Sequence, residues 1–237
     1  IMLGLGTGLS SGIASSEFSI ADTSPGLWLK FNTGQTTLDS DSDGDSDVQW
    51  ADSSGNGNDA TSATDAKQGS FEDGAWSSAD SADFLALDSN ITLTDAYTIF
   101  IVFTVQNTSD TFIGGPNTND FMKFGQGNNA AKFRAKHSNT VSDITFGTNP
   151  STGKNMFKIF RNSDGDELSI TQNTTTSLID GGTITTNDFV IGKIPSGANG
   201  LDDGYLWEAV VYDRAVTADE SALIEADILT RTSLTED

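Results

Sequence analysis

Short runs in which apolar and polar residues alternate recur along most of the chain, separated by clusters of Gly, Ser, Asn and Asp. Alternation with a period of two is typical of β-strands buried on one face, and such clusters are typical of turns. The run YTIFIVFTV is apolar at both its odd and its even positions, so it predicts a central strand buried on both faces. Strands are predicted at residues 26–31, 48–51, 82–87, 97–105, 112–114, 121–124, 132–137, 143–146, 155–161, 167–171, 188–194 and 205–212, and a long loop at residues 53–80.

A single amphipathic helix is predicted near the end of the chain, from residue 218 to about residue 231. Thr217 is placed to cap its first turn, and Glu220 stands three residues later, which together form a capping box. The predicted apolar face consists of Leu223, Ile224, Ile228 and the stem of Arg231. We expect this helix to pack against the edge of a β-sandwich. No internal repeat or second domain is visible, so residues 19–237 are predicted to form one domain.

The composition agrees with one large all-β domain. The 237 residues include 24 glycines, 4 prolines and no cysteine, so we expect many short strands joined by turns, without a disulfide framework. The formal net charge is −22, from 34 acidic and 12 basic residues. Such a surface repels nucleic acids and anionic membranes. No apolar run approaches the roughly 20 residues of a membrane-spanning helix, so we expect no nucleic-acid binding and no membrane insertion.

The first 18 residues form a different kind of segment, rich in Gly, Ser, Ala and Leu and apolar at its start. Such a segment is too flexible to fold alone, because ordering its glycines costs much entropy. We interpret residues 1–18 as an arm that anchors the domain to another chain; the alternative is a disordered tail. The side chains expected to contact the partner are Met2, Leu3, Leu5 and Leu9.

Five aspartates occupy alternate positions between residues 39 and 47, with Gly44 among them. Carboxylates crowded this closely repel each other unless a cation neutralises them, and oxygen ligands on a glycine-hinged loop suit calcium. Trp50 stands where a calcium loop places its final acid, so a neighbouring aspartate would have to close the shell. The alternative is a solvated acidic loop. The predicted calcium ligands are Asp39, Asp41, Asp43, Asp45, Asp47 and Asp52.

The basic residues are unevenly distributed, since seven of the 12 lie between residues 123 and 161. Lys132, Arg134 and Lys136 share one face of a predicted strand, because alternate residues point to the same side. On an acidic chain this strip predicts a contact with the acidic face of a neighbouring copy, in a head-to-tail arrangement. The alternative is ordinary solvation of a sheet face.

Three longer stretches stand in a recognisable order. They are GLWLKF with VQWADSSGNGNDAT (residues 26–31 and 48–61), YTIFIVFTV (97–105) and GYLWEAVVYDRAVTADESALIEADI (204–228). Together they resemble the laminin-G-like (pentraxin-like) branch of the concanavalin A-like lectin/glucanase superfamily, over about residues 24–231. The resemblance implies a jelly-roll sandwich of two antiparallel sheets. It also implies that Asp52 and Asn56 fix the early loop or bind a cation; the alternative for Asp52 and Asn58 is hydrogen bonding to backbone amides.

The acidic residues that cleave glucans in this superfamily are absent. Those enzymes carry a Glu-x-Asp-x-(x)-Glu run that places two carboxyl groups on one strand for retaining hydrolysis, and no such run occurs here. His137 is the only histidine, and a lone histidine beside Lys136 is more typical of a surface residue than of a catalytic triad. There is no histidine or cysteine cluster for zinc. The chain is therefore predicted not to be an enzyme.

Sugar binding requires exposed aromatic side chains beside polar groups. Of the four tryptophans, Trp28 and Trp207 lie in predicted strands and are expected in the core. Trp50 and Trp76 flank predicted loops, so they are the candidate platforms, with Asn56 as a polar contact.

These patterns predict a non-catalytic structural or interaction module of a large assembly. The apolar arm and the acidic, cysteine-free composition resemble virion proteins of marine phages. That resemblance implies a multi-copy capsid-decoration, tail or fibre-associated protein on the virion, held by its arm to other assembly proteins and stabilised by calcium. The alternative is a carbohydrate-binding, lectin-like module that is secreted or extracellular and has a glycan as its partner.

Overall fold

The computed structural model describes most of the chain after the first 17 residues. The described residues are 18–38, 47–62, 68–78, 83–89, 91–93, 96–104, 111–114, 121–125, 131–137, 140–146, 153–162, 167–172, 175–180, 190–191 and 204–234. The elements are η1 (Ile20–Thr23), β1 (Leu27–Leu29), β2 (Gln35–Leu38), β3 (Asp47–Trp50), β4 (Ala60–Ser62), β5 (Ser70–Glu72), β6 (Ala75–Ser77), β7 (Leu85–Leu87), β8 (Tyr97–Thr104), β9 (Thr111–Gly114), β10 (Phe121–Phe124), β11 (Lys132–His137), β12 (Thr140–Thr145), β13 (Asn155–Arg161), β14 (Glu167–Gln172), β15 (Thr175–Asp180), β16 (Val190–Ile191), β17 (Tyr205–Tyr212) and α1 (Ala218–Thr232).

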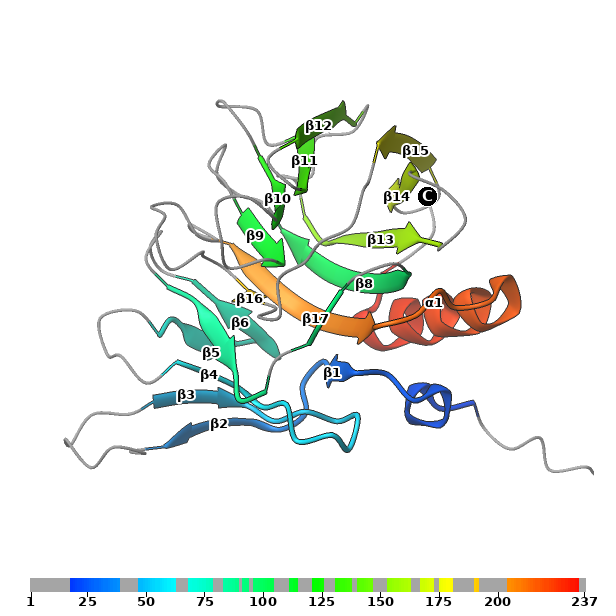
Figure 1. The fold of residues 1–237 in the computed structure, drawn as a ribbon. Helices are drawn as coiled ribbons and strands as arrows, with labels where there is room; N and C mark the ends of the chain where they lie inside the picture. Colours follow the sequence, from blue (N-terminus) through cyan, green and yellow to red (C-terminus); the bar gives the residue numbers. More distant parts are fainter. Residues whose placement is uncertain are drawn as a thin grey trace, which may run out of the picture.

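The strands form a sandwich of antiparallel sheets (Figure 1). One layer is an eight-stranded sheet in the order β15-β14-β13-β8-β17-β6-β5, with β1 paired to the end of β17. The facing layer consists of a five-stranded sheet, β16-β7-β4-β3-β2, and a four-stranded sheet, β12-β11-β10-β9. These two sheets lie side by side, because edge strand β16 of the five-stranded sheet contacts edge strand β9 of the four-stranded sheet. The predicted all-β antiparallel sandwich with one C-terminal helix is confirmed.

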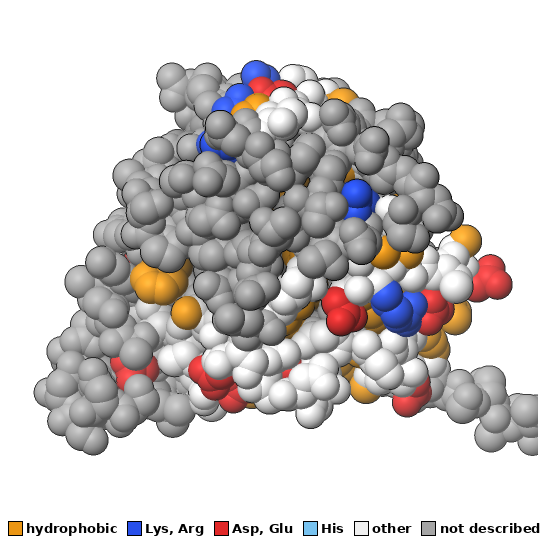
Figure 2. Space-filling model, in the orientation of Figure 1, with side chains coloured by type: hydrophobic (Ala, Val, Ile, Leu, Met, Phe, Trp, Pro, Cys, Tyr) orange, Lys and Arg blue, Asp and Glu red, His pale blue; other side chains and the backbone are white. Residues whose placement is uncertain are grey.

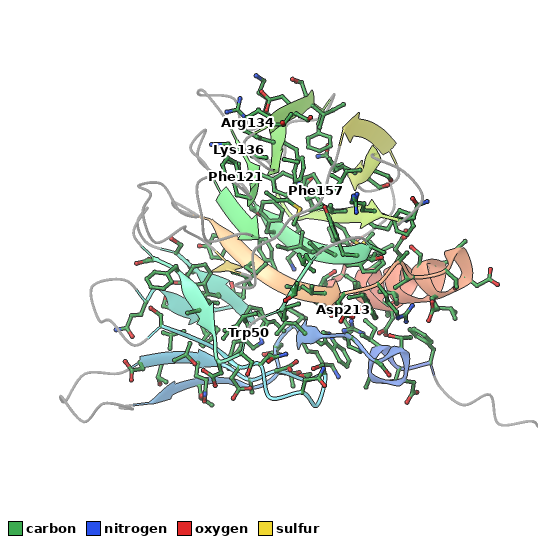
Figure 3. The ribbon with its side chains drawn as sticks, in the orientation of Figure 1. Trp50, Phe121, Arg134, Lys136, Phe157 and Asp213 are labelled. Atoms are coloured by element: carbon green, nitrogen blue, oxygen red, sulfur yellow. The ribbon has the colours of Figure 1, made fainter. Side chains whose placement is uncertain are left out.

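The main core lies between these layers. Alternation places Ile99, Ile101 and Phe103 of β8 on the inner face, where they meet residues of both facing sheets. Trp50 and Phe157, labelled in Figure 3, belong to this core and are fully buried. Burying one such large apolar side chain stabilises the fold by about 1.5–3 kcal/mol. The sandwich is therefore held together mainly by this inner layer of aromatic and branched residues.

A second core covers the outer face of the eight-stranded sheet. The intervening residues of β8, Phe100 and Val102, belong to one buried cluster with Ile224 and Ile228 of helix α1. All eight residues of β8 are consequently buried, as the doubly apolar sequence predicted. The expectation that the helix lies at the sandwich edge is wrong: α1 packs across the outer face of the central strands.

Helix α1 begins as predicted. Thr217 accepts a hydrogen bond from the backbone of Glu220, and the Glu220 side chain accepts one from the Thr217 backbone, which completes the capping box. The predicted apolar face is corrected at Leu223, which is 50% exposed. None of the helices among the described residues is long and apolar enough to cross a membrane.

The last residue of the predicted arm contacts the domain that follows it. Phe18 is half-buried and packs against the outer core, so it contacts its own domain. The remaining arm, with Met2, Leu3, Leu5 and Leu9, lies outside the described residues, and its role as an anchor stays a prediction.

The predicted loop at residues 53–80 is wrong, because β4, β5 and β6 lie within it. Strands β5 and β6 form a hairpin across Asp73 and Gly74, whose φ angles are 49° and 79°. Two positive φ angles define the tight turn that an Asp-Gly pair favours, so the sequence did contain a signal for this hairpin. Strands β2 and β15 also went unpredicted, since QTTL and TTSLID show little alternation of apolar and polar residues.

Candidate functional site

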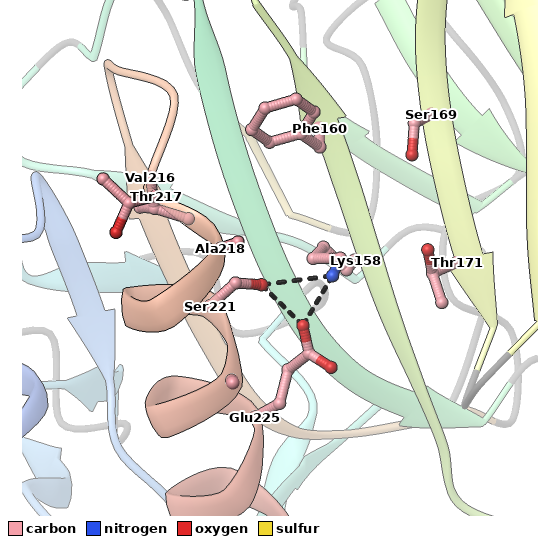
Figure 4. Close-up of a pocket in the computed structure, with 10 residues that line it drawn as sticks. Lys158, Phe160, Ser169, Thr171, Val216, Thr217, Ala218, Ser221 and Glu225 are labelled. Carbon is pink, nitrogen blue, oxygen red and sulfur yellow. Dashed lines mark hydrogen bonds and ion pairs between the residues drawn. The ribbon is translucent and has the colours of Figure 1, made fainter.

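An open groove lies beside helix α1 on the outer face of the eight-stranded sheet (Figure 4). Its volume is about 420 Å³. Strands β13 and β14 contribute the floor, and the first two turns of the helix contribute one wall. The side chains used below come from both parts: Lys158, Phe160, Ser169, Thr171, Ser221 and Glu225.

Strand alternation explains why these floor residues face the groove. Phe157 and Ile159 are buried in the main core, so Lys158 and Phe160 point to the other face of β13. The antiparallel register pairs Lys158 with Thr171 and Phe160 with Ser169. An aromatic ring, an ammonium group and two hydroxyl groups thus meet on a small area of sheet.

The helix closes this area with a polar network. Ser221 and Glu225 are four residues apart and therefore lie on the same helix face. The Lys158 ammonium lies 2.6 Å from Glu225 Oε1 and donates to Ser221 Oγ at 3.1 Å. Ser221 Oγ donates in turn to Glu225 Oε1 at 2.6 Å. The positive and negative charges balance, so the groove walls carry no net charge on a strongly acidic protein.

This network is unsuited to nucleophilic catalysis. A serine–lysine pair requires a neutral amine to take the hydroxyl proton. Here the Lys158 ammonium is held by the Glu225 carboxylate at 2.6 Å, and the Ser221 hydroxyl already donates to the same carboxylate. The arrangement can hold a polar ligand but does not activate a nucleophile.

Two polar atoms of the groove remain available to a ligand. Within the described part of the chain, Ser169 Oγ and Glu225 Oε2 have no hydrogen-bond partner. Phe160 is half-buried, so part of its ring faces the groove. A hydroxyl, a carboxylate oxygen and an aromatic face together match the outline of a sugar, whose hydroxyls form hydrogen bonds and whose C–H face packs on a ring.

The predicted sugar platforms are corrected by the structure. Trp50 and Trp76 are both 0% exposed, and their indole N–H groups donate to backbone carbonyls within the domain. They are core residues, because the loops they flank fold back as strands β4 to β6 and cover them. Trp28 and Trp207 are buried as predicted.

Asp52 fixes the loop that follows β3. Its Oδ1 accepts from the backbone N–H groups of Trp28 and Ser54, at 2.9 and 2.8 Å. Its Oδ2 accepts from Ser54 Oγ at 2.6 Å and from the Asn58 backbone at 3.1 Å. A carboxylate accepts about four hydrogen bonds, so these donors fill both oxygens of Asp52. Its geometry is that of a loop anchor.

The neighbouring asparagines complete this loop. Asn56 Nδ2 donates to the carbonyls of Pro25 and Gly26, and Asn58 Nδ2 donates to Gly26 at 2.7 Å. The D-x-S-G-N-G-N sequence thus ties the loop to the chain entering β1. Asn56 acts as a structural residue here. It was predicted to contact a glycan, but it is not among the residues that line the groove.

Four residues of the aspartate run lie outside the described residues: Asp39, Asp41, Asp43 and Asp45. Asp47 opens β3 and is 2% exposed. Among the residues that the structure describes, no group of three acidic or histidine side chains is arranged to hold a metal.

The basic strip is present as predicted on one face of β11. Lys132 and Arg134 pair with Asp143 on β12. The Lys136 ammonium lies 5.7 Å from the centre of the Phe121 ring. This strip, with Arg134 and Lys136 labelled in Figure 3, belongs to the four-stranded sheet, whereas the floor of the groove belongs to the eight-stranded sheet.

Glu208, an acidic residue in the strand of the third resembling stretch, is fully buried beneath helix α1. Its Oε1 accepts from Trp28 Nε1 at 2.8 Å and from the Arg231 guanidinium, while Oε2 has no partner. Burial raises the pKa of this carboxyl, and Arg231 partly offsets the effect. The pair joins the helix to the sheet and is closed to substrate.

The sequence did not predict the groove, because the residues that line it are far from one another in the chain. Lys158 and Ser221 are 63 positions apart and meet only through the packing of α1 on β13. Alternation in the predicted strands 155–161 and 167–171 did indicate which side chains share a face. No local pattern indicated that the helix would lie beside them.

No known family matches the sequence, and no curated protein matches it. Solved structures with the same fold were found. The botulinum neurotoxin serotype D binding domain matches at 11% identity and a TM-score of 0.60, over 88% of this chain and 52% of that one. A serotype D/C binding domain matches at 15% identity and a TM-score of 0.56, over 88% and 53%.

A sialidase of Trypanosoma rangeli, solved with 2,3-difluoro-KDN, matches at 12% identity and a TM-score of 0.58, over 91% of this chain and 34% of the sialidase. The chain therefore spans about half or less of these proteins. At such low identity the likeness shows the fold alone, a concanavalin A-like β-sandwich.

Proposed function

We propose that this protein is a non-catalytic carbohydrate-binding module and that the groove beside α1 holds the sugar. The observation that carries the proposal is the meeting of Phe160 with the open polar atoms of Ser169 and Glu225. The fold supports it, since solved proteins of this fold include toxin binding domains and a sialidase bound to a sugar acid derivative. The proposal transfers no activity from those proteins.

The charge of the groove selects the kind of sugar. The Lys158–Glu225 pair neutralises itself, and the protein carries a net charge of −22. An acidic sugar would meet overall repulsion and no unbalanced cation in the groove. We therefore expect a neutral saccharide.

Glycan-array binding followed by calorimetry tests the proposal. Phe160→Ala is expected to weaken binding of the selected neutral saccharide about tenfold or more, since it removes the stacking surface. Glu225→Gln should also weaken binding, because it disturbs both the acceptor and the Lys158 pair.

Leu223→Ala is the matched control, because this exposed residue lies on the same helix but does not line the groove. It should leave affinity unchanged, and melting curves of all variants verify folding. Absence of any glycan ligand, or equal binding by Phe160→Ala and the unaltered protein, would overturn the proposal.

Calcium stabilisation is proposed for the aspartate run, with Asp52 left out because its oxygens are already occupied. Calcium at about 10 mM, the range of the weakest extracellular sites, is expected to raise Tm by linkage, and EDTA to reverse it. Asp41→Asn with Asp43→Asn should remove the response. A melting curve that ignores calcium contradicts this proposal.

The assembly role, including a place on a phage virion, stays a prediction. It rests on residues 1–17, which lie outside the described residues. The location of the protein, on a virion or outside the cell, likewise stays a prediction.

A further inference from the structure

Two stacked aromatic rings lie on the outer face of the eight-stranded sheet, outside the groove. Tyr205 and Trp207 are alternate residues of β17, and Leu206 between them is buried in the main core, so both rings belong to the outer face. Their centroids are 5.5 Å apart and their planes differ by 26°. Trp207 is buried and occupies one face of the Tyr205 ring, and the half-buried Tyr205 presents its remaining surface to solvent.

The ring pair is held in place by its neighbours. The Lys154 ammonium lies 5.0 Å from the centre of the Trp207 ring and 5.3 Å from that of Phe31. It also donates to the backbone carbonyl of Thr232, in the last turn of α1, at 3.0 Å. These contacts fix Trp207, on which Tyr205 rests. A binding surface that is already ordered loses less conformational entropy when a ligand binds.

Polar side chains border Tyr205 on the edge strand β5. Strand β6 lies between β17 and β5, and its outward residues Ala75 and Ser77 are small, which leaves room for the ring to pass above them. The Tyr205 hydroxyl reaches Glu72 Oε2 at 3.5 Å, and Ser70 Oγ donates to Glu72 Oε1 at 3.3 Å. Glu72 and Ser70 are exposed. A carboxylate accepts about four hydrogen bonds, so Glu72 keeps acceptor capacity for the hydroxyl groups of a ligand.

This combination suits a neutral sugar better than a charged ligand. A cage for a cation surrounds it with rings, whereas Trp207 lies nearly parallel to Tyr205 and against it. An anion is repelled by Glu72. In Figure 2 most visible Asp and Glu side chains lie in the lower half, where Figure 1 places β5 and β6, and Lys and Arg gather mainly at the top. A sugar packs its C–H face on the ring and donates its hydroxyls to the carboxylate.

The ring pair and the groove lie at opposite ends of helix α1 on one face of the sheet. The first two turns of the helix line the groove, whereas Thr232 in the last turn contacts Lys154 beside Trp207. The helix has 15 residues and is therefore about 22 Å long. A ligand that reaches both places must extend for roughly this length.

We propose that Tyr205, with Glu72 and Ser70, forms a second saccharide-binding site, and that the ligand is a neutral polysaccharide chain that occupies this site and the groove together. The proposal deepens the proposed function and rests on it, because the groove is the first of the two sites. A chain that binds at one site meets the other at a high effective concentration, so the pair of sites selects long chains over short ones.

Calorimetry with saccharides of different length tests the proposal. The probes are a β-glucan, a xylan and a mannan, each compared with its own disaccharide, which is too short to reach both sites. At equal concentration of sugar units, we expect at least one polymer to bind about tenfold or more tightly than its disaccharide. Tyr205→Ala should remove this advantage and leave disaccharide binding in the groove, whereas Tyr205→Phe keeps the ring and should retain the advantage.

Two further variants keep the test independent of folding. Glu72→Ala removes the acceptor at an exposed position, so it should reduce the advantage of the polymer even if Tyr205→Ala lowers stability. Val141→Ala is the control, because this apolar residue of β12 is 44% exposed and lies outside both sites. It should change neither affinity, and melting curves verify that every variant folds.

The variants also separate this proposal from the proposed function. If Tyr205→Ala keeps the full advantage of the polymer while Phe160→Ala loses binding, the groove stands and the second site is wrong. If Tyr205→Ala abolishes binding while Phe160→Ala binds like the unaltered protein, the site at Tyr205 stands and the groove is wrong. Equal affinity for polymer and disaccharide, or no binding of any probe, overturns the selection of long chains.

Discussion

Replacing Asp52 with alanine is expected to lower the free energy of unfolding by about 3 kcal/mol or more. The substitution removes four hydrogen bonds and leaves the backbone N–H groups of Trp28, Ser54 and Asn58 without their acceptor. Each unpaired, part-buried donor costs about 1–3 kcal/mol. Urea unfolding measures the loss as a lower midpoint with an unchanged slope.

Two further substitutions sharpen this test. Asp52→Asn keeps the size of the side chain but turns one acceptor into a donor that faces other donors, so it should cost nearly as much. Asp213→Ala removes an exposed aspartate and should change stability by no more than about 0.5 kcal/mol. If Asp52→Ala is neutral for folding but abolishes the calcium response, Asp52 is a calcium ligand and the anchor role is wrong.

Replacing Glu208 with alanine is expected to cost about 3–5 kcal/mol, the effect of breaking a buried ion pair by removing one partner. Glu208 is fully buried, and its loss removes the acceptor of Trp28 Nε1 and leaves Arg231 with Asp227 alone. Glu225→Ala is the control, because Glu225 also pairs helix α1 with the sheet, but its pair with Lys158 is partly exposed and contributes about 1 kcal/mol or less.

The Glu208 carboxyl also gives a dependence on pH. Burial raises its pKa in the folded state above the ordinary value of 4.5, so the folded protein binds this proton more tightly than the unfolded chain. The contribution of Glu208 to stability is therefore greatest at low pH and falls as pH rises through the raised pKa. Glu208→Gln cannot titrate, so the stability difference between the unaltered protein and this variant should decrease over that window. A difference that is constant with pH contradicts the raised pKa.

The local sequence determined those elements whose pattern is carried by consecutive residues. Strands β10, β11, β13 and β17 occur at the predicted positions, because each is a short run of alternating or mostly apolar residues. The doubly apolar run of β8 required cover on both faces, and the capping box marked the start of α1. The motif around Asp52 likewise specified a tight loop, because its hydrogen-bonding groups lie within seven residues and reach the adjacent β1.

Tertiary structure decided the features that join distant residues. Strands β4 to β6 are too short and too polar to stand out, and they form because neighbouring strands supply their hydrogen bonds and bury Trp50 and Trp76. The place of α1 across the sheet, rather than at its edge, follows from the apolar outer residues of β8 and β17. That packing alone brings Lys158 to Ser221 and Glu225 and creates the groove. Local periodicity assigns a side chain to a face of its element, but which element covers that face depends on contacts between residues far apart in the chain.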